Sequence, residues 1–188
     1  MKNKSIKKMT GLSLLTAVTV VLALLSNVTI GTVNLNLALI PIVVGACIYG
    51  PSGGLFLGIV DGALTCVAPS TLSLFMTHNI PLTIILCLLK TGLAGLFSGI
   101  IYQLLKGKND LVAVILAALI VPIINTGIFL MGVFMFFIPV YEKLAGDTLN
   151  VARFILKSTL TFNFLIEFIL NLILSPTIHR IIKYKEKF

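Results

Sequence analysis

The sequence predicts an all-α integral membrane protein: a single membrane domain over residues 1–188, with six transmembrane helices and both termini in the cytoplasm. The composition is 58% hydrophobic and 11% charged, whereas soluble domains carry about 25% charged residues. A mean hydropathy of +1.12 leaves too little polar surface to coat a globule in water. Long apolar stretches recur along the chain, and short basic clusters lie beside them, as in proteins that cross a bilayer.

The individual spans follow from length, since a helix needs about 20 apolar residues to cross the hydrocarbon core and shorter or tilted spans also occur. Six stretches fit this pattern: Thr10–Ser26, Leu35–Tyr49, Ser52–Val67, Ile80–Leu105, Leu111–Phe137 and Leu160–Ile182. The second and third are short. Because Gly50-Pro51 lies between them and predicts a tight turn, we expect these two spans to form a helical hairpin.

Orientation follows from lysine and arginine, which favour the cytoplasmic side. With an inner N-terminus and six spans, ten basic residues are cytoplasmic: Lys2, Lys4, Lys7, Lys8, Lys106, Lys108, Arg180, Lys183, Lys185 and Lys187. Three are external: Lys143, Arg153 and Lys157. This bias requires an even number of spans. The outer loops are then expected at residues 27–34, 68–79 and 138–158, and loops on one face of a bundle are natural lids for a site.

The net charge of +8 does not indicate nucleic-acid binding. Ten of the fourteen basic residues lie in clusters beside apolar runs, where they fit an anionic bilayer surface, and no basic face or aromatic platform accompanies them. Cys47, Cys66 and Cys87 lie in or beside apolar stretches without metal-binding spacing. They are interpreted as small buried hydrophobes. We expect no metal and no cofactor.

Lys90 is the only charged residue among the 26 residues of Ile80–Leu105. It lies ten or so residues from either interface, roughly 15 Å at 1.5 Å per residue, which is too far for its side chain to reach water easily. An ammonium in hydrocarbon costs at least about 2–3 kcal/mol. Lys90 is therefore expected to face the protein interior, with Asp61 or Glu167 as a candidate partner. A contact to an anionic substrate group and a structural ion pair both remain open.

Asp61 is the acidic residue of the third span, in GIVDGAL between Gly58 and Gly62. At this depth it must be paired or reach a water-filled cavity. We interpret the flanking glycines as surfaces for close helix packing rather than for substrate approach.

A polar stripe marks the sixth span, where Asn163, Glu167 and Asn171 recur every four residues. This spacing places them on one helix face, and that face is expected to point into the bundle because lipid offers no hydrogen-bond partners. Asn163 and Glu167, nearer the outside, are candidate ligand contacts. Asn171 is deeper and is interpreted as structural.

Asn125 interrupts the fifth span in VPIINTGIF, one turn after Pro122. The proline predicts a kink, and an amide beside a kink can face a cavity. Asn125 is a candidate ligand contact; the alternative is a hydrogen bond to a neighbouring helix, worth about 1 kcal/mol.

Two outer-loop residues and two small residues complete the candidates. His78 and Phe75 lie in the second outer loop, where Phe75 could cover an apolar ligand. His78 could equally be solvated, with no second histidine or cysteine nearby for a metal. Ser13 and Ala17 form a smooth patch on the first span that serves internal packing or docks another membrane protein.

Several motifs are missing. The sequence has no GxxxxGK[ST] phosphate loop, no HExxH and no GxSxG, so no nucleotide hydrolysis or hydrolase chemistry of these kinds is expected. Three function classes remain: a solute-binding transporter subunit, an autonomous ion-coupled secondary transporter using Asp61, Lys90 and Glu167, and a membrane enzyme using Glu167 or Asp61 as acid or base. We favour the first and expect no enzyme.

The chain resembles the substrate-binding (S) components of energy-coupling factor (ECF) vitamin transporters. The resemblance covers nearly the whole chain and rests on its size, its six spans and three segments: LIPIVVGACIYGPSGGLFLGIVDG at Leu39–Gly62, LKTGLAGLFSGIIYQLLK at Leu89–Lys106 and PIINTGIF at Pro122–Phe129.

The resemblance implies a division of labour. The S component would bind one vitamin from the extracellular side and work in the cell membrane with a transmembrane scaffold and two cytoplasmic ATPases. The family usually docks its scaffold through alanine-x3-alanine on the first span; Ser13 and Ala17 stand there instead. Lys90 would suit a carboxylate, and Asn125 and Asn163 hydroxyl or amide groups. Without tryptophan, a large flat ring is disfavoured. Pantothenate fits best, while pyridoxine-type and other small vitamins remain open.

Overall fold

A computed structural model describes residues 2–26, 36–145, 151–158 and 164–185 of the chain. This described part is helical and contains no β-strand. Its elements are α1 (Lys2–Ser26), α2 (Leu39–Tyr49), α3 (Pro51–Cys66), α4 (Pro69–Thr71), the π-helix η1 (Leu72–Met76), α5 (Ile80–Leu105), α6 (Asp110–Gly132), the π-helix η2 (Val133–Phe137), α7 (Ile138–Ala145), α8 (Val151–Ser158) and α9 (Leu165–Lys185).

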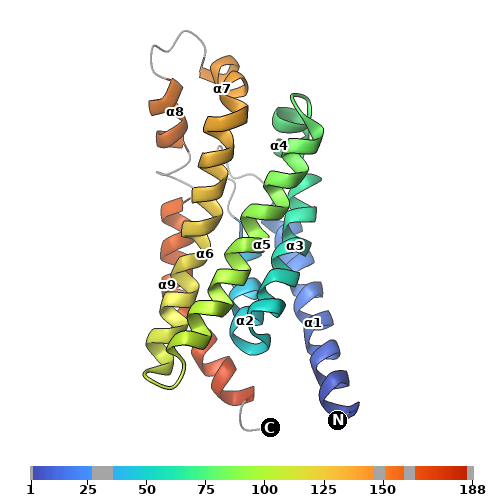
Figure 1. The fold of residues 1–188 in the computed structure, drawn as a ribbon, viewed down its shortest axis with the longest axis vertical. Coiled ribbons are helices and arrows are strands. Elements are labelled where there is room, and N and C mark those ends of the chain that lie inside the picture. The colour runs from blue at the N-terminus through green and yellow to red at the C-terminus, as the bar shows by residue number, and fades with distance from the viewer. Residues whose placement is uncertain (1, 27–35, 146–150, 159–163, 186–188) are drawn as a thin grey trace.

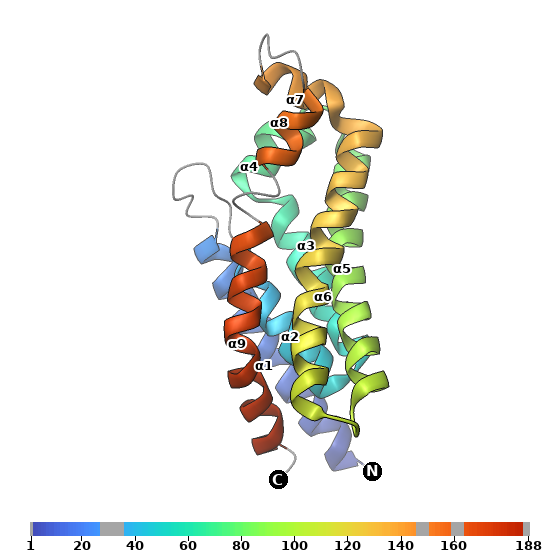
Figure 2. The ribbon, with the colours of Figure 1, turned by 90° about the vertical axis from the view of Figure 1, so that its left-hand side faces the viewer.

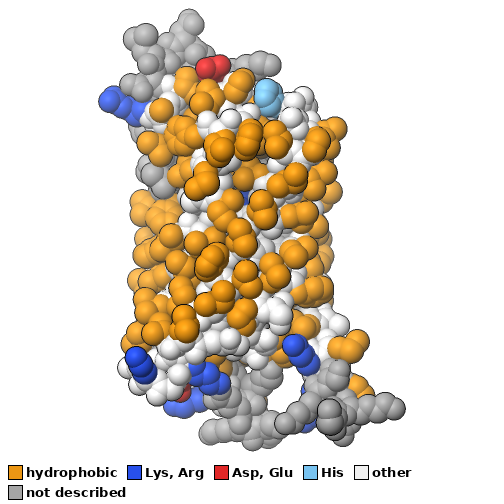
Figure 3. All heavy atoms as spheres, viewed as in Figure 1, with side chains coloured by type: hydrophobic (Ala, Val, Ile, Leu, Met, Phe, Trp, Pro, Cys, Tyr) orange, Lys and Arg blue, Asp and Glu red, His pale blue; other side chains and the backbone are white. Residues whose placement is uncertain are grey.

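The long helices run side by side along one axis of an elongated bundle (Figures 1 and 2). Both chain ends lie at one end of it, and α4, α7 and α8 lie at the other. We call these the terminal end and the distal end. On the face shown in Figure 3 the side chains are mainly apolar, and the lysines and arginines gather mostly at the terminal end. Termini at one end agree with an even number of crossings.

Four helices in the described residues are long and apolar enough to cross a membrane: Ile6–Ser26, Ile80–Leu105, Asp110–Glu142 and Leu165–Tyr184. A fifth candidate is the pair Pro51–Cys66 and Pro69–Met76, which is bent by 60°. The multi-pass membrane architecture is therefore supported, with four or five candidate spans where the sequence predicted six.

The missing span is explained by α2, which has only 11 residues and a length of about 16 Å at 1.5 Å per residue. It is almost entirely buried, and it lies in the terminal half of the bundle among α3, α5 and α6 (Figure 1). The predicted hairpin is present: Gly50 takes φ of 79° between α2 and α3, and Pro51 begins α3. Glycine adopts positive φ without the clash that a Cβ would cause.

The predicted outer loops need two corrections. Residues 68–79 were expected to be a loop, but Pro69–Met76 is helical and continues α3 after the bend. Residues 138–158 were also expected to be a loop, but α7 and α8 occupy most of it. In the second segment, the fully buried Ile155 shows that α8 packs one face against the rest of the chain. The first predicted loop, residues 27–34, lies outside the described residues.

Glycines bring α3 and α5 into close contact. A Cβ on Gly54, Gly58 or Gly62 would meet the backbone of α5, and one on Gly95 would meet the backbone of Gly54. These glycines recur every four residues along one face of α3, so the two backbones approach closely. The interpretation of the α3 glycines as packing surfaces is confirmed. Gly95 on α5 is likewise covered by α3.

Hydrogen bonds fix α5 between its neighbours. The Thr91 hydroxyl donates to the carbonyl of Gly58 in α3 at 2.6 Å, and the Ser98 hydroxyl donates to the carbonyl of Ala117 in α6 at 2.8 Å. At its start, the Asn79 side chain caps α5 by accepting from the amide of Leu82, a normal helix-start arrangement. In the structure α5 runs from Ile80 to Leu105, the range expected for this span.

Replacing Gly58 with alanine tests the α3–α5 contact. The new methyl group would meet the carbonyl of Thr91 and the Cα of Gly92, so we expect a loss of about 1–3 kcal/mol from overpacking and a melting temperature several degrees lower in detergent. Gly127→Ala is the matched control, because nothing lies within 4 Å of its Cβ position. Alanine there should be neutral or stabilising, by up to about 1 kcal/mol. Equal melting temperatures for the two variants would contradict this packing.

Candidate functional site

Lys90 points inward from the middle of α5, as the sequence predicted. Its neighbour Thr91 is bonded to α3, and this contact sets the rotation of the helix and turns Lys90 toward α6. The Lys90 ammonium lies 5.5 Å from the centre of the Phe129 ring on α6, a cation–π arrangement. The side chain is half-buried.

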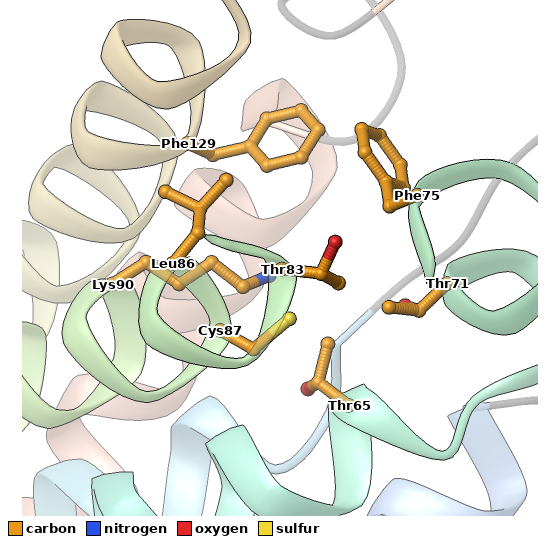
Figure 4. Close-up of a pocket in the computed structure, with 8 residues that line it drawn as sticks. All are labelled: Thr65, Thr71, Phe75, Thr83, Leu86, Cys87, Lys90 and Phe129. Carbon is orange, nitrogen blue, oxygen red and sulfur yellow. The ribbon is translucent and has the colours of Figure 1, made fainter. Parts of the chain in front are cut away.

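A small cavity adjoins the Lys90 ammonium (Figure 4). Its walls come from α3, α4, η1, α5 and α6, and the lining residues are Thr65, Thr71, Phe75, Thr83, Leu86, Cys87, Lys90 and Phe129. The volume is about 30 Å³, which holds a water molecule or two. Small-molecule pockets measure about 300–1,000 Å³, so a vitamin does not fit this conformation without movement of the walls.

The cavity combines hydrogen-bond donors with apolar rings. Thr83 donates to the carbonyl of Asn79, whereas the hydroxyls of Thr65 and Thr71 make no hydrogen bond to any described residue. One ammonium and two available hydroxyls are suited to an anionic or hydroxylated group. Phe75 and Phe129 form the apolar side.

Asp61 and Glu167 lie in the interior at the level where α2 begins. Both are nearly inaccessible, at 1% and 5% exposure. Their common partner is Asn36, just before α2. The Asn36 side-chain amide donates to Asp61 Oδ2 at 2.8 Å, and the Asn36 backbone amide donates to Glu167 Oε1 at 3.0 Å. We call these three residues the Asn36 clasp.

Lys90 makes no ion pair with either acid, nor with any other residue in the described ranges. Its charge nevertheless acts through space on both Asp61 and Glu167. The structural ion pair considered for Lys90 is therefore absent from this conformation. The acids are held by the Asn36 clasp, and the ammonium is left beside a ring and a cavity.

Asn125 and Asn171 both face the interior and are 6% and 2% exposed. The side-chain oxygen of each is buried without a hydrogen-bond partner in the described part. Asn125 lies one turn from Phe129 on α6 and thus on the cavity side of that helix. The Asn171 amide donates to the carbonyl of Glu167 at 2.9 Å, as expected for a structural role. The predicted polar stripe on α9 is inward-facing at both described positions; Asn163 lies outside the described residues.

Phe75 and His78 have different positions at the distal end. Phe75 lines the cavity, and its ring packs edge-on against Phe129 and Phe137, with centroids 5.8 and 5.2 Å away. It also packs against Tyr141. His78 is exposed and contacts Phe137 from the outside, 5.9 Å between centroids, so it is not among the cavity residues.

Ser13 and Ala17 are exposed on α1, which leaves them available to another membrane protein. Sequence reasoning missed Asn36 and six of the residues that line the cavity: Thr65, Thr71, Thr83, Leu86, Cys87 and Phe129. Asn36 carried a signal, a polar side chain at the start of the apolar run LALIPIVVGA. Thr65 and Thr71 carried none, because threonine is common in apolar helices and bonds to its own backbone there.

Comparison with known proteins identifies the family. Residues 7–179 match the family model described as ECF transporter, substrate-specific component. No curated protein and no solved structure matches the chain. The match covers most of the chain. The apolar multi-pass bundle and the buried polar residues agree with it. This protein therefore belongs to the ECF transporter substrate-specific component family, whose members are substrate-binding membrane subunits of transporters and not enzymes.

Proposed function

We propose that this chain is the S component that captures pantothenate from the extracellular side in the cavity beside Lys90. The observation that carries the proposal is an ammonium at the middle of a membrane helix, without an ion pair in the described residues and adjoining a cavity with two available hydroxyls. The carboxylate of the vitamin would bind Lys90, and its hydroxyl and amide groups would bind Asn125 and Asn163. Asp61 and Glu167, which the sequence also made candidates, would stay bound to Asn36.

The distal end supplies the entrance. The cavity is lined in part by α4 and η1, and α4 lies at the distal end. On the face shown in Figure 3 the basic residues gather mostly at the opposite end, which favours a cytoplasmic terminal end in the cell membrane. A cavity of about 30 Å³ is the closed form. Entry of the vitamin requires η1, which carries Phe75, to separate from the aromatic rings of α6 and η2. His78, on the outer side of the same contact, would border the entrance.

The family assignment brings scaffold and ATPase partners with it, and we propose one transmembrane scaffold and two cytoplasmic ATPases. The identity of the substrate is tested by purifying the protein from membranes without added vitamin. Native mass spectrometry then looks for a retained small molecule, and calorimetry measures the binding of added vitamins. We expect retained pantothenate or tight binding of added pantothenate. Tight binding of pyridoxine instead would reassign the substrate. Uptake by the chain alone in liposomes under an ion gradient would favour a secondary transporter.

Lys90→Met should weaken pantothenate binding by about tenfold to a hundredfold, since a hydrogen bond to a charged group contributes about 1.5–3 kcal/mol. Binding of the alcohol analogue, in which a CH2OH group replaces the carboxylate, should change little. Calorimetry with both ligands makes the comparison. Lys108→Met is the control, because Lys108 is an exposed lysine at the terminal end. Equal losses for both ligands would argue against a carboxylate contact.

Asn125→Leu should weaken pantothenate binding by about twofold to tenfold, the contribution of one neutral hydrogen bond. Stability should not fall, because the substitution removes a buried oxygen that has no partner in the described part. Asn171→Leu is the matched control: its oxygen is buried in the same way, but we place it outside the site. Binding isotherms and melting curves of both variants separate the two roles. Unchanged affinity in Asn125→Leu would remove this residue from the site.

Ser13→Phe combined with Ala17→Phe should prevent assembly with the scaffold and leave pantothenate affinity unchanged, because both residues are exposed on α1 and remote from the cavity. Co-purification with the scaffold and ATPases measures the effect. Val18→Phe is the control, as Val18 is also exposed, at 41%, but projects about 100° away from Ala17 around the helix. A complex that survives the double substitution would place docking elsewhere.

A further inference from the structure

We propose that Asn36 is a positioning residue: it holds the carboxylates of Asp61 and Glu167 away from Lys90, so that the ammonium stays available for the anionic group of the ligand. This inference rests on the proposed function, because it concerns the same ammonium. It assigns a role to a residue whose side-chain and backbone N–H hydrogen bonds go to Asp61, Glu167 and Ala38 and not to Lys90 or a cavity-lining residue, and it makes the two acids groups that must be restrained.

The hydrogen bonds of Asn36 fix which way its amide points. Its side-chain oxygen accepts from the backbone N–H of Ala38 at 3.1 Å, and a backbone N–H can only donate. The NH2 group must therefore face the other way, where it donates to Asp61 Oδ2 at 2.8 Å. Its own backbone N–H donates to Glu167 Oε1 at 3.0 Å. One residue thus supplies a donor to each buried acid from a single fixed orientation.

The short α2 explains why a polar backbone group reaches this depth. Because α2 spans only half of the bundle, its first turn lies in the interior, near Asp61 on α3 and Glu167 on α9. Asn36 precedes the N-cap residue Ala38, so its backbone N–H has no acceptor within the helix and donates to Glu167 instead. Asn36 is anchored from the other side as well, since the amide of the next residue, Leu37, donates to the hydroxyl of Ser26 at 3.0 Å.

The electrostatic consequence concerns Lys90. Its charge acts on both acids, and at low dielectric a carboxylate without donors is drawn strongly to a nearby cation. Two acids compete for one ammonium. If either formed an ion pair with Lys90, a ligand carboxylate would have to break that pair before it could bind. Donors from Asn36 satisfy the acids in place, which removes this competition.

The experiment measures two ligands in one set of variants. Asn36→Ala removes the side-chain donor to Asp61. We expect it to weaken pantothenate binding by about tenfold, the scale of a hydrogen bond to a charged group, and to leave binding of the neutral alcohol analogue nearly unchanged. The double variant Asn36→Ala/Asp61→Asn should recover most of the lost affinity, because a neutral amide no longer competes for the ammonium. A purely structural role for Asn36 predicts equal losses for both ligands and no recovery.

The outcomes separate the inference from the proposed function. Unaltered discrimination between the two ligands in Asn36→Ala, or a double variant no better than the single one, overturns the inference. If Lys90→Met in the same titrations still loses pantothenate selectively, the proposed function stands without it. If Lys90→Met loses nothing, both fail. Binding of the alcohol analogue shows whether a variant is folded. If Asn36→Ala does not bind the analogue, Asn36→Ser is titrated in its place, because serine keeps one short donor. We then expect a smaller selective loss of pantothenate affinity.

Discussion

The polar interior of this protein depends on the close contact between α3 and α5. Glycines on both helices let the backbones approach, and the bond from Thr91 to Gly58 fixes their relative rotation. Asp61 and Lys90 lie directly beside the contacting residues Gly62 and Thr91 on their respective helices, so the same contact determines where each charge points. A wider separation of α3 and α5 would change the distance between Asp61 and the Lys90 ammonium. It would also move Thr65 away from Cys87, which line the cavity from the two helices.

The buried charges are partly satisfied by groups other than their opposite charges. Amide donors of Asn36 hold the two acids, and the Phe129 ring lies beside the ammonium. A cation–π contact and charge-assisted hydrogen bonds from amides can stabilise charge in the interior without an ion pair. This arrangement leaves the Lys90 ammonium without an ion pair in the described residues.

The two ends of the bundle have different physical tasks. At the distal end, rings from η1, α6 and η2 pack edge-on over the small cavity, and two π-helices, a form often found at functional sites, meet through Phe75 and Phe137. At the terminal end, α2 fills the interior and basic residues gather outside. In the described residues, the small cavity thus lies beside the elements of the distal end, and the buried helix α2 lies in the terminal half.

The sequence by itself determined the membrane character, the hairpin at Gly50-Pro51, the bounds of α5 and the inward direction of Lys90, Asp61, Glu167 and Asn171. These follow from hydropathy, from glycine and proline geometry, and from the cost of charge in lipid, all of which are local. It did not determine that α2 stops halfway through the bundle, that residues 69–76 continue α3 after a bend, or that Asn36 rather than Lys90 partners the acids. Only the tertiary structure decided these, because a hydrogen-bond partner depends on which helices meet at one depth, and that depends on packing between residues far apart in the chain.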